Sequence, residues 1–157
     1  MPLTPRGWQR AGALAVFFGS KAGLPAPDRI YAAAAGKEKV APHVKAGSNS
    51  KRPMETISPL AAKLGLTPIT KFSKGDEANL AAEIVKQDGT TLVSWQHEDI
   101  PEIAKLIMGG EHGIPDPWPG ERFDLVWCFS RSGSGQPWTF TQVCQRLLAG
   151  DGSHPIE

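Results

Sequence analysis

The chain has 157 residues, 40% of them hydrophobic, and a formal net charge of +1. This composition fits one globular domain, excludes wholesale disorder and gives no sign of a nucleic-acid partner. The longest apolar run, residues 11–18, is far shorter than the roughly 20 residues that span a membrane, so we expect no membrane partner and a cytoplasmic location.

The N-terminal segment is predicted to be an amphipathic helix. Thr4 is a favourable N-cap, and Pro5 suits the first helical position. The apolar residues that follow at helical spacing are Trp8, Ala11, Leu14, Ala15 and Phe18. The alternative is a secretory signal, because Arg6 and Arg10 precede the apolar run. We favour the helix, because Trp8 and Gln9 interrupt the design of a signal peptide.

Helices and strands alternate along the rest of the chain. Strands are predicted at residues 28–33, 67–72, 91–95, 123–130 and 138–143. Helices are predicted at residues 53–64, 76–86 and 99–108, and Gly65 is placed to end the first of them. Residues 36–50 and 109–121 are predicted loops. This order predicts an α/β fold with a mostly parallel sheet, helices on both of its faces and a final hairpin.

The predicted domain covers residues 1–150, and residues 151–157 form a tail that we expect to fray. Cys128 and Cys144 fit a reducing compartment, although one bridge between them stays open as an alternative. The cysteines and histidines lack the close spacing of metal ligands. We therefore predict neither a metal nor a cofactor.

Arg52 is the first candidate for binding chemistry. It stands at the predicted start of a helix, where its guanidinium and the free N–H groups of the first turn converge on one anion. The planar guanidinium meets two phosphate oxygens at once. The simpler interpretation is a surface arginine that balances Glu55.

His97 is the second candidate. It follows the predicted strand 91–95 at its carboxyl end, where parallel α/β sheets bind their ligands. A histidine there donates to an oxyanion or exchanges a proton near neutral pH. The alternative is a histidine that packs at the start of the next helix.

Three segments together resemble one family. Ser48, Arg52 and Thr56 form an S-x-x-x-R-x-x-x-T frame followed by PLAAKLGL, and TLVSWQHEDI places His97 after a strand. The early segment LTPRGWQRAGAL and the later segment WPGERFDLVWCF fit the same order. These segments resemble the histidine phosphatase superfamily, whose fold is phosphoglycerate-mutase-like, and the resemblance covers most of the chain.

The resemblance implies roles for individual residues. Members of the family phosphorylate a histidine in an R-H-G motif at the end of the first strand. In this chain Arg52 corresponds to a phosphate-binding arginine and His97 to the second, catalytic histidine, which also binds phosphate. Ser48 and Thr56 correspond to positions with structural roles. Pro53 stands where the family often has alanine, and Glu55 where it often has glutamine.

The R-H-G motif is absent from the chain. The resemblance therefore implies a residual phosphate pocket, for a phosphate or phosphorylated small molecule, that is impaired or inactive in phosphomonoester hydrolysis, a pseudoenzyme. The first alternative is an active phosphomonoesterase whose natural start lies upstream. The second is a non-catalytic interaction module on the same fold, with Trp118 and Trp138 as candidate contact residues, although we favour ordinary core or loop packing for both.

The identity of the acid that protonates the leaving group stays open among three candidates. Glu98 adjoins His97 and is the closest candidate, and Asp76 and Glu77 lie before the third helix. Each is also explained as a solvated carboxylate at a helix start. His43 is a less favoured substitute nucleophile, and we expect it to be an exposed loop residue.

The absent first strand has a structural consequence. In the family this strand is central, so its loss is expected to leave unpaired edges on two neighbouring strands, one of them at residues 91–95. Bare edges pair with other chains. We therefore expect the chain to self-associate or to be poorly stable.

The remaining two histidines, His112 and His154, lie in segments without regular structure. We expect both to be surface residues.

Overall fold

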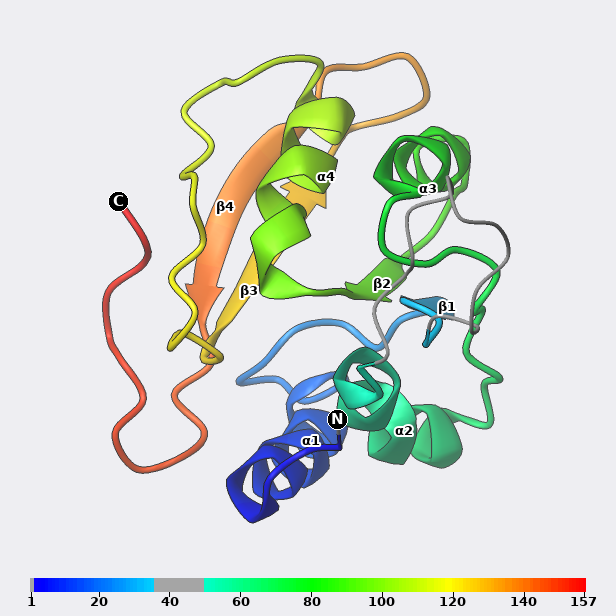
Figure 1. Cartoon of the computed structure of the whole chain (residues 1–157). Coiled ribbons are helices and arrows are strands. Elements are labelled where there is room, and N and C mark those ends of the chain that lie inside the picture. Colours follow the sequence, from blue (N-terminus) through cyan, green and yellow to red (C-terminus); the bar gives the residue numbers. More distant parts are fainter. Residues whose placement is uncertain (1, 36–49) are drawn as a thin grey trace, which may run out of the picture. The chain divides into compact units, whose positions relative to one another are not determined.

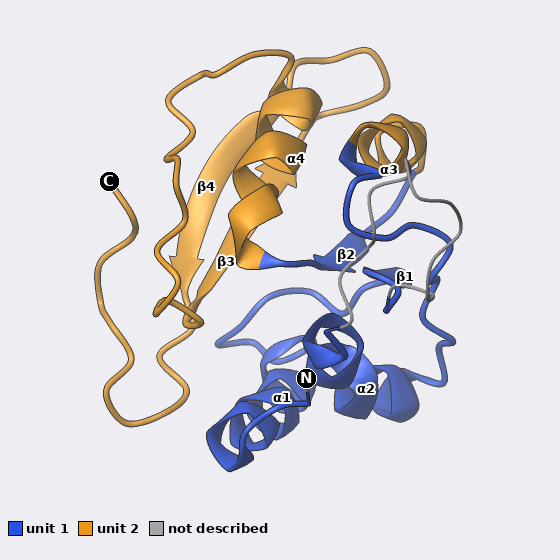
Figure 2. Ribbon diagram, in the orientation of Figure 1, with its two compact units in different colours: residues 1–77, 88–96 blue, residues 78–87, 97–157 orange. Residues whose placement is uncertain are grey.

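The computed structural model describes residues 2–35 and 50–157. These residues form two compact units, shown in different colours in Figure 2. Unit 1 comprises residues 1–77 and 88–96, and unit 2 comprises residues 78–87 and 97–157.

Two helices of unit 1 lie where the sequence predicts them (Figure 1). Helix α1 spans Pro5–Phe17, and the Oγ1 atom of its N-cap Thr4 accepts a hydrogen bond from the Gly7 N–H at 3.1 Å. Helix α2 spans Arg52–Leu64 and ends at Gly65, whose φ of 68° is left-handed. Glycine adopts this conformation without the steric cost that a Cβ imposes, so the predicted stop is confirmed.

The buried face of α1 is close to the predicted one. Its buried residues are Arg10, Ala11, Leu14, Ala15 and Phe17, and Phe18 is buried after them. Trp8 differs, because its side chain is 44% exposed. At about 100° per residue, Trp8 lies at the margin of the buried arc. Spacing alone therefore placed Trp8 on the correct side of the helix but not inside the core.

The sheet of unit 1 is parallel. Strand β1 spans Arg29–Ala32 and pairs with β2, Thr91–Ser94, in a register that places Tyr31 opposite Val93. On the other side of β1, residues 69–73 form parallel bridges at Ile69 and Ser73. The segment predicted as a strand at residues 67–72 therefore pairs through isolated bridges and does not form a continuous strand.

β2 has a strand partner on one side only within the described residues. Its single partner is β1. This pairing agrees with an edge at Thr91–Ser94 as far as the described residues go, and the unpaired edge itself stays a prediction.

Unit 2 contains most of helix α3, Glu77–Ile84, and all of helix α4, Ile100–Met108. A 3-10 turn, η1, spans His97–Asp99 and leads directly into α4. Helix α4 ends at Gly109, which adopts a φ of 74°. The predicted helices at residues 76–86 and 99–108 are thus confirmed with shifted ends.

The predicted C-terminal hairpin is also confirmed. Strand β3, Leu125–Ser130, pairs antiparallel with β4, Thr139–Cys144. Aromatic side chains cover one face of the hairpin, where the Trp127 ring lies 4.9 Å from Trp118 and 5.2 Å from Phe140 between centroids. Trp118, Leu125 and Ile156 form the buried cluster that anchors this face.

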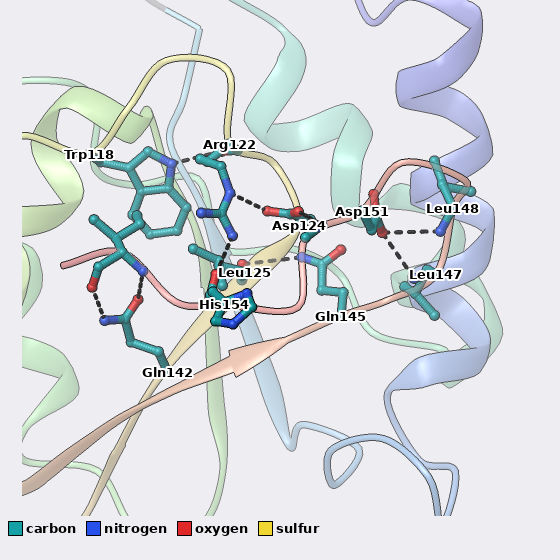
Figure 3. A network of polar contacts seen from close by, with 12 residues as sticks. Trp118, Arg122, Asp124, Leu125, Gln142, Gln145, Leu147, Leu148, Asp151 and His154 are labelled. Carbon is teal, nitrogen blue, oxygen red and sulfur yellow. Dashed lines mark hydrogen bonds and ion pairs between the residues drawn. The ribbon is translucent and has the colours of Figure 1, made fainter.

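The prediction of a frayed tail is wrong. Figure 3 shows polar contacts that hold residues 145–157 against the hairpin. The Gln142 amide donates to the Ile156 carbonyl at 2.8 Å and accepts from the Ile156 N–H at 3.1 Å. Ile156 is 8% exposed. The sequence of the tail is mostly polar with one isoleucine and gives no sign of this ordered packing, because hydrogen bonds from side chains to the backbone produce no periodic pattern.

The α/β class is confirmed, but a single large parallel sheet is not observed. The described residues form one parallel and one antiparallel sheet, each of two strands. The single domain at residues 1–150 stays a prediction. None of the helices in the described ranges has the length and apolar character needed to cross a membrane.

The two cysteines lie on opposite faces of the hairpin. Cys128 is opposite Thr141, and Cys144 is opposite Leu125. Side chains alternate between faces along a strand, and directly opposed residues share a face. An odd separation of three residues therefore places Leu125, and with it Cys144, on the face away from Cys128. Both cysteines are free.

We expect the Cys128 thiol to be unreactive in the folded chain. Burial raises its pKa above the ordinary value of 9.0, so less of it is thiolate at about pH 8, and the thiolate is the reacting form. Modification with a disulfide reagent tests this in the Cys144→Ser variant, with and without denaturant. The expected result is slow reaction of the folded variant and fast reaction after unfolding. Equal rates in the two states contradict the prediction.

Candidate functional site

The N-terminus of α2 is the best candidate for a binding site in unit 1. Lys51 is its N-cap and makes no side-chain capping bond, while Ser50 Oγ accepts from the Arg52 N–H at 3.3 Å. Pro53 occupies the first turn, where its missing N–H costs nothing. The first turn of a helix presents partial positive charge, which favours a bound anion.

A cavity of about 710 Å³ opens beside this helix start. Its lining comes from the carboxyl end of β1, the first turn of α2 and two other segments. The lining residues are Pro2, Ala33, Ala34, Ala35, Lys51, Met54, Glu55 and Thr70. Three consecutive alanines leave this space because each side chain is only a methyl group. The volume is in the range of small-molecule sites.

The guanidinium of Arg52 lies at the margin of this cavity. Its Nε donates to the carbonyl of Pro2 at 3.4 Å, and Pro2 lines the cavity. Within the described ranges, neither terminal nitrogen of Arg52 has a hydrogen-bond partner among the side chains or carbonyls. Arg52 is exposed, so these donors face solvent and are accessible to a ligand.

Charges of both signs surround the cavity. Lys51 and Arg52 are cationic, and Glu55 lines the same cavity with a carboxylate. Glu55 forms part of the first turn, and its N–H donates to the Lys51 carbonyl at 2.9 Å. The net charge at the helix start is positive, but Glu55 weakens its attraction for an anion.

Thr56 is engaged within its own helix. Its hydroxyl donates to the Arg52 carbonyl at 2.6 Å, within the same helix. Ser48 lies outside the described residues, as does His43. The Arg52 prediction therefore rests on α2 and the cavity rather than on the full frame.

His97 and Glu98 share the turn η1 at the start of unit 2. His97 is half-buried and Glu98 is exposed. The loop at residues 109–121 passes close to the imidazole, since a Cβ at Gly120 would lie 3.4 Å from His97 Nε2. Arg52 belongs to unit 1, so its approach to His97 stays a prediction.

The other two candidate acids are engaged locally. Asp76 Oδ2 accepts from the N–H of Ser73 at 3.1 Å and from its hydroxyl at 3.3 Å. Glu77 is 4% exposed and accepts from Trp95 Nε1 at 3.2 Å and from the Gly75 N–H. These bonds give both carboxylates a structural role, which leaves Glu98 as the exposed candidate.

The tryptophans proposed as contact residues differ from each other. Trp118 is 7% exposed, and its Nε1 donates to the Arg122 carbonyl at 2.7 Å. It belongs to the core, which confirms the favoured interpretation of ordinary packing rather than a contact role. Trp138 is half-buried and lies 4.4 Å from the Arg131 guanidinium. His112 and His154 are exposed, as predicted.

The sequence also held signals that were missed. Lys51 adjoins Arg52, and the four alanines at residues 32–35 include the last residue of the first strand and the three that follow it. A run of small residues at the carboxyl end of a parallel strand favours a cavity, because little side-chain volume fills the space.

Comparison with family models, with curated proteins and with solved structures found no match.

Proposed function

We propose that the chain binds the phosphate group of a small phosphorylated molecule at the N-terminus of α2 and hydrolyses phosphomonoesters poorly or not at all. The observation that carries the proposal is the cavity beside Arg52, at the carboxyl end of β1. The resemblance to the histidine phosphatases adds His97 as a second phosphate ligand and Glu98 as an acid.

Three features of unit 1 support anion binding. The helix dipole of α2 favours negative charge at its start, Lys51 adds a cation, and Arg52 offers two terminal nitrogens in a planar fork. A phosphate oxygen pair matches that fork. Glu55 favours a singly rather than a doubly charged ligand, because it places one carboxylate in the same lining.

The chemistry of turnover needs more than this pocket. Hydrolysis through a phosphohistidine splits one displacement into two, and it requires an imidazole that attacks phosphorus in line with the leaving oxygen. The R-H-G motif that supplies this group in the resembling family is absent from the sequence. Electrostatic stabilisation by Arg52 and His97 alone holds a phosphate without providing the nucleophile.

Calorimetric titration with inorganic phosphate tests the proposal. Arg52→Ala is expected to weaken binding about tenfold or more, because a charge-assisted hydrogen bond contributes about 1.5–3 kcal/mol. The matched control is Lys21→Ala, which removes one exposed cation from the same unit. Equal affinity in wild type and Arg52→Ala, or equal weakening by Lys21→Ala, contradicts the proposal.

The His97→Ala variant tests whether His97 binds phosphate together with Arg52. Weaker phosphate binding by this variant supports a pocket that includes both residues. Binding that depends on Arg52 but not on His97 restricts the site to the α2 helix start and removes His97 and Glu98 from the proposal.

A further inference from the structure

An alanine run forms part of the lining of the cavity beside α2. Ala33, Ala34 and Ala35 come directly after β1, and all three line the cavity. The Ala33 N–H donates to the Ser94 carbonyl at 3.0 Å, and the Ala34 N–H donates to the Phe72 carbonyl at 2.9 Å. Both N–H groups are thus used within unit 1. Ala33 and Ala34 therefore offer a ligand their methyl groups but no N–H donor.

Few polar side chains line the cavity among the residues that the structure describes. Pro2 and Met54 add apolar surface, and the side chains that can form hydrogen bonds are those of Lys51, Glu55 and Thr70. Lys51 and Thr70 are exposed, so water also competes for them. A ligand with many hydroxyl groups would leave some of them against methyl groups without partners, which weakens binding.

Glu55 restricts the charge of the ligand. Its side chain is half-buried and lines the same cavity, whereas the phosphate-binding cations Lys51 and Arg52 lie at the helix start. A second negative charge on the ligand, beyond the phosphate group, would lie beside this carboxylate. Like charges brought together in this way disfavour a ligand.

We propose that the α2 site takes a phosphomonoester whose body is compact and apolar, an aryl or short alkyl group. The site discriminates against sugar phosphates and against phosphorylated carboxylic acids. This inference rests on the proposed function, because it describes the part of the ligand beyond the phosphate group. The cavity of about 710 Å³ leaves room for such a body.

Calorimetric titration of the wild-type chain with three ligands tests the preference for an apolar body. Phenyl phosphate is expected to bind about tenfold more tightly than inorganic phosphate, because the ring is removed from water. A hexose phosphate is expected to bind no more tightly than inorganic phosphate, because its hydroxyl groups lose water without gaining partners.

Met54→Gln tests whether the lining of this cavity causes the preference. Glutamine has a similar length and suits a helix, but it replaces apolar surface with an amide. The variant is expected to lose most of the advantage of phenyl phosphate while keeping its affinity for inorganic phosphate. Met108→Gln is the matched control, because Met108 is also a half-buried helical residue but is not among the lining residues.

Glu55→Gln tests the discrimination by charge. Wild type is expected to bind para-carboxyphenyl phosphate at least about threefold more weakly than phenyl phosphate, the scale of a partly screened charge pair. The variant keeps the shape of the side chain and removes its charge, so this difference is expected to disappear.

The outcomes separate this inference from the proposed function. If inorganic phosphate binds through Arg52 but phenyl phosphate binds no more tightly, or a hexose phosphate binds best, the inference is overturned and the proposed function stands. An advantage of phenyl phosphate that survives Met54→Gln, or falls equally in Met108→Gln, also overturns it. If the wild type binds none of these ligands, both are overturned.

Discussion

Asp124→Ala is expected to lower the free energy of unfolding by about 3 kcal/mol, in the range for breaking a buried ion pair. The Asp124 carboxylate accepts from Arg122 Nε at 2.8 Å and from the Gly152 N–H at 2.6 Å. Arg122 also donates to the His154 carbonyl at 2.8 Å. One buried carboxylate thus ties the hairpin to the C-terminal tail (Figure 3).

Lys105→Ala is the matched control for this prediction. Lys105 forms an ion pair of the same 2.8 Å length with Asp116, but the Asp116 side chain is 50% exposed. Solvent screens that pair, so we expect little change in stability. Chemical denaturation of both variants measures the difference. A similarly small loss of stability in both variants contradicts the prediction that the Asp124 ion pair stabilises the fold.

Asp124 also predicts a pH dependence. Burial by itself would raise the pKa of its carboxyl, but the hydrogen bonds from Arg122 and Gly152 outweigh burial and hold that pKa below 3.8. The stability that Asp124 contributes is therefore present above its unfolded pKa of about 3.9 and is lost as pH falls through the lower folded value. In Asp124→Asn this acid-dependent loss is expected to shrink.

Leu60→Ala is expected to cost about 2–5 kcal/mol, the range measured for cavities left by large core side chains. Leu60 is 0% exposed and lies in α2 with Ile57 and Ala61, which are also buried. Its removal leaves a void among residues that have no room to collapse.

The same substitution at a surface position is its control. Leu106 of α4 is 42% exposed, so Leu106→Ala is expected to change stability by within about 0.5 kcal/mol. Denaturant titration of both variants decides the matter. A loss from Leu60→Ala as small as that from Leu106→Ala would show that α2 is not packed as described.

Local signals in the sequence predicted most elements. Thr4 and Gly65 mark helix ends through specific backbone chemistry, and the alternating large apolar residues of 123–129 indicate a strand. These predictions held because each depends on neighbours in the chain. The Gln142 bonds to Ile156 were missed because they join residues fourteen positions apart through side-chain geometry.

The candidate site was predictable in part. Arg52 and His97 were identified by motif and by their places after a loop and a strand, and Arg52 indeed begins a helix beside a cavity. The cavity itself depends on how Ala33, Thr70 and Met54 come together in the tertiary structure, which no local sequence pattern predicts. The buried roles of Glu77 and Trp118 also depend on tertiary contacts.

Hydrolysis of an aryl phosphate by the wild-type chain, beside Arg52→Ala and His97→Ala, is the most direct test of a phosphate pocket without turnover. We expect that the wild type, although it binds phosphate, releases no more phenol than either variant. Turnover by the wild type that both variants lose would contradict it, because a nucleophile would then have to act in this chain. His43 would be the first residue to substitute in that case.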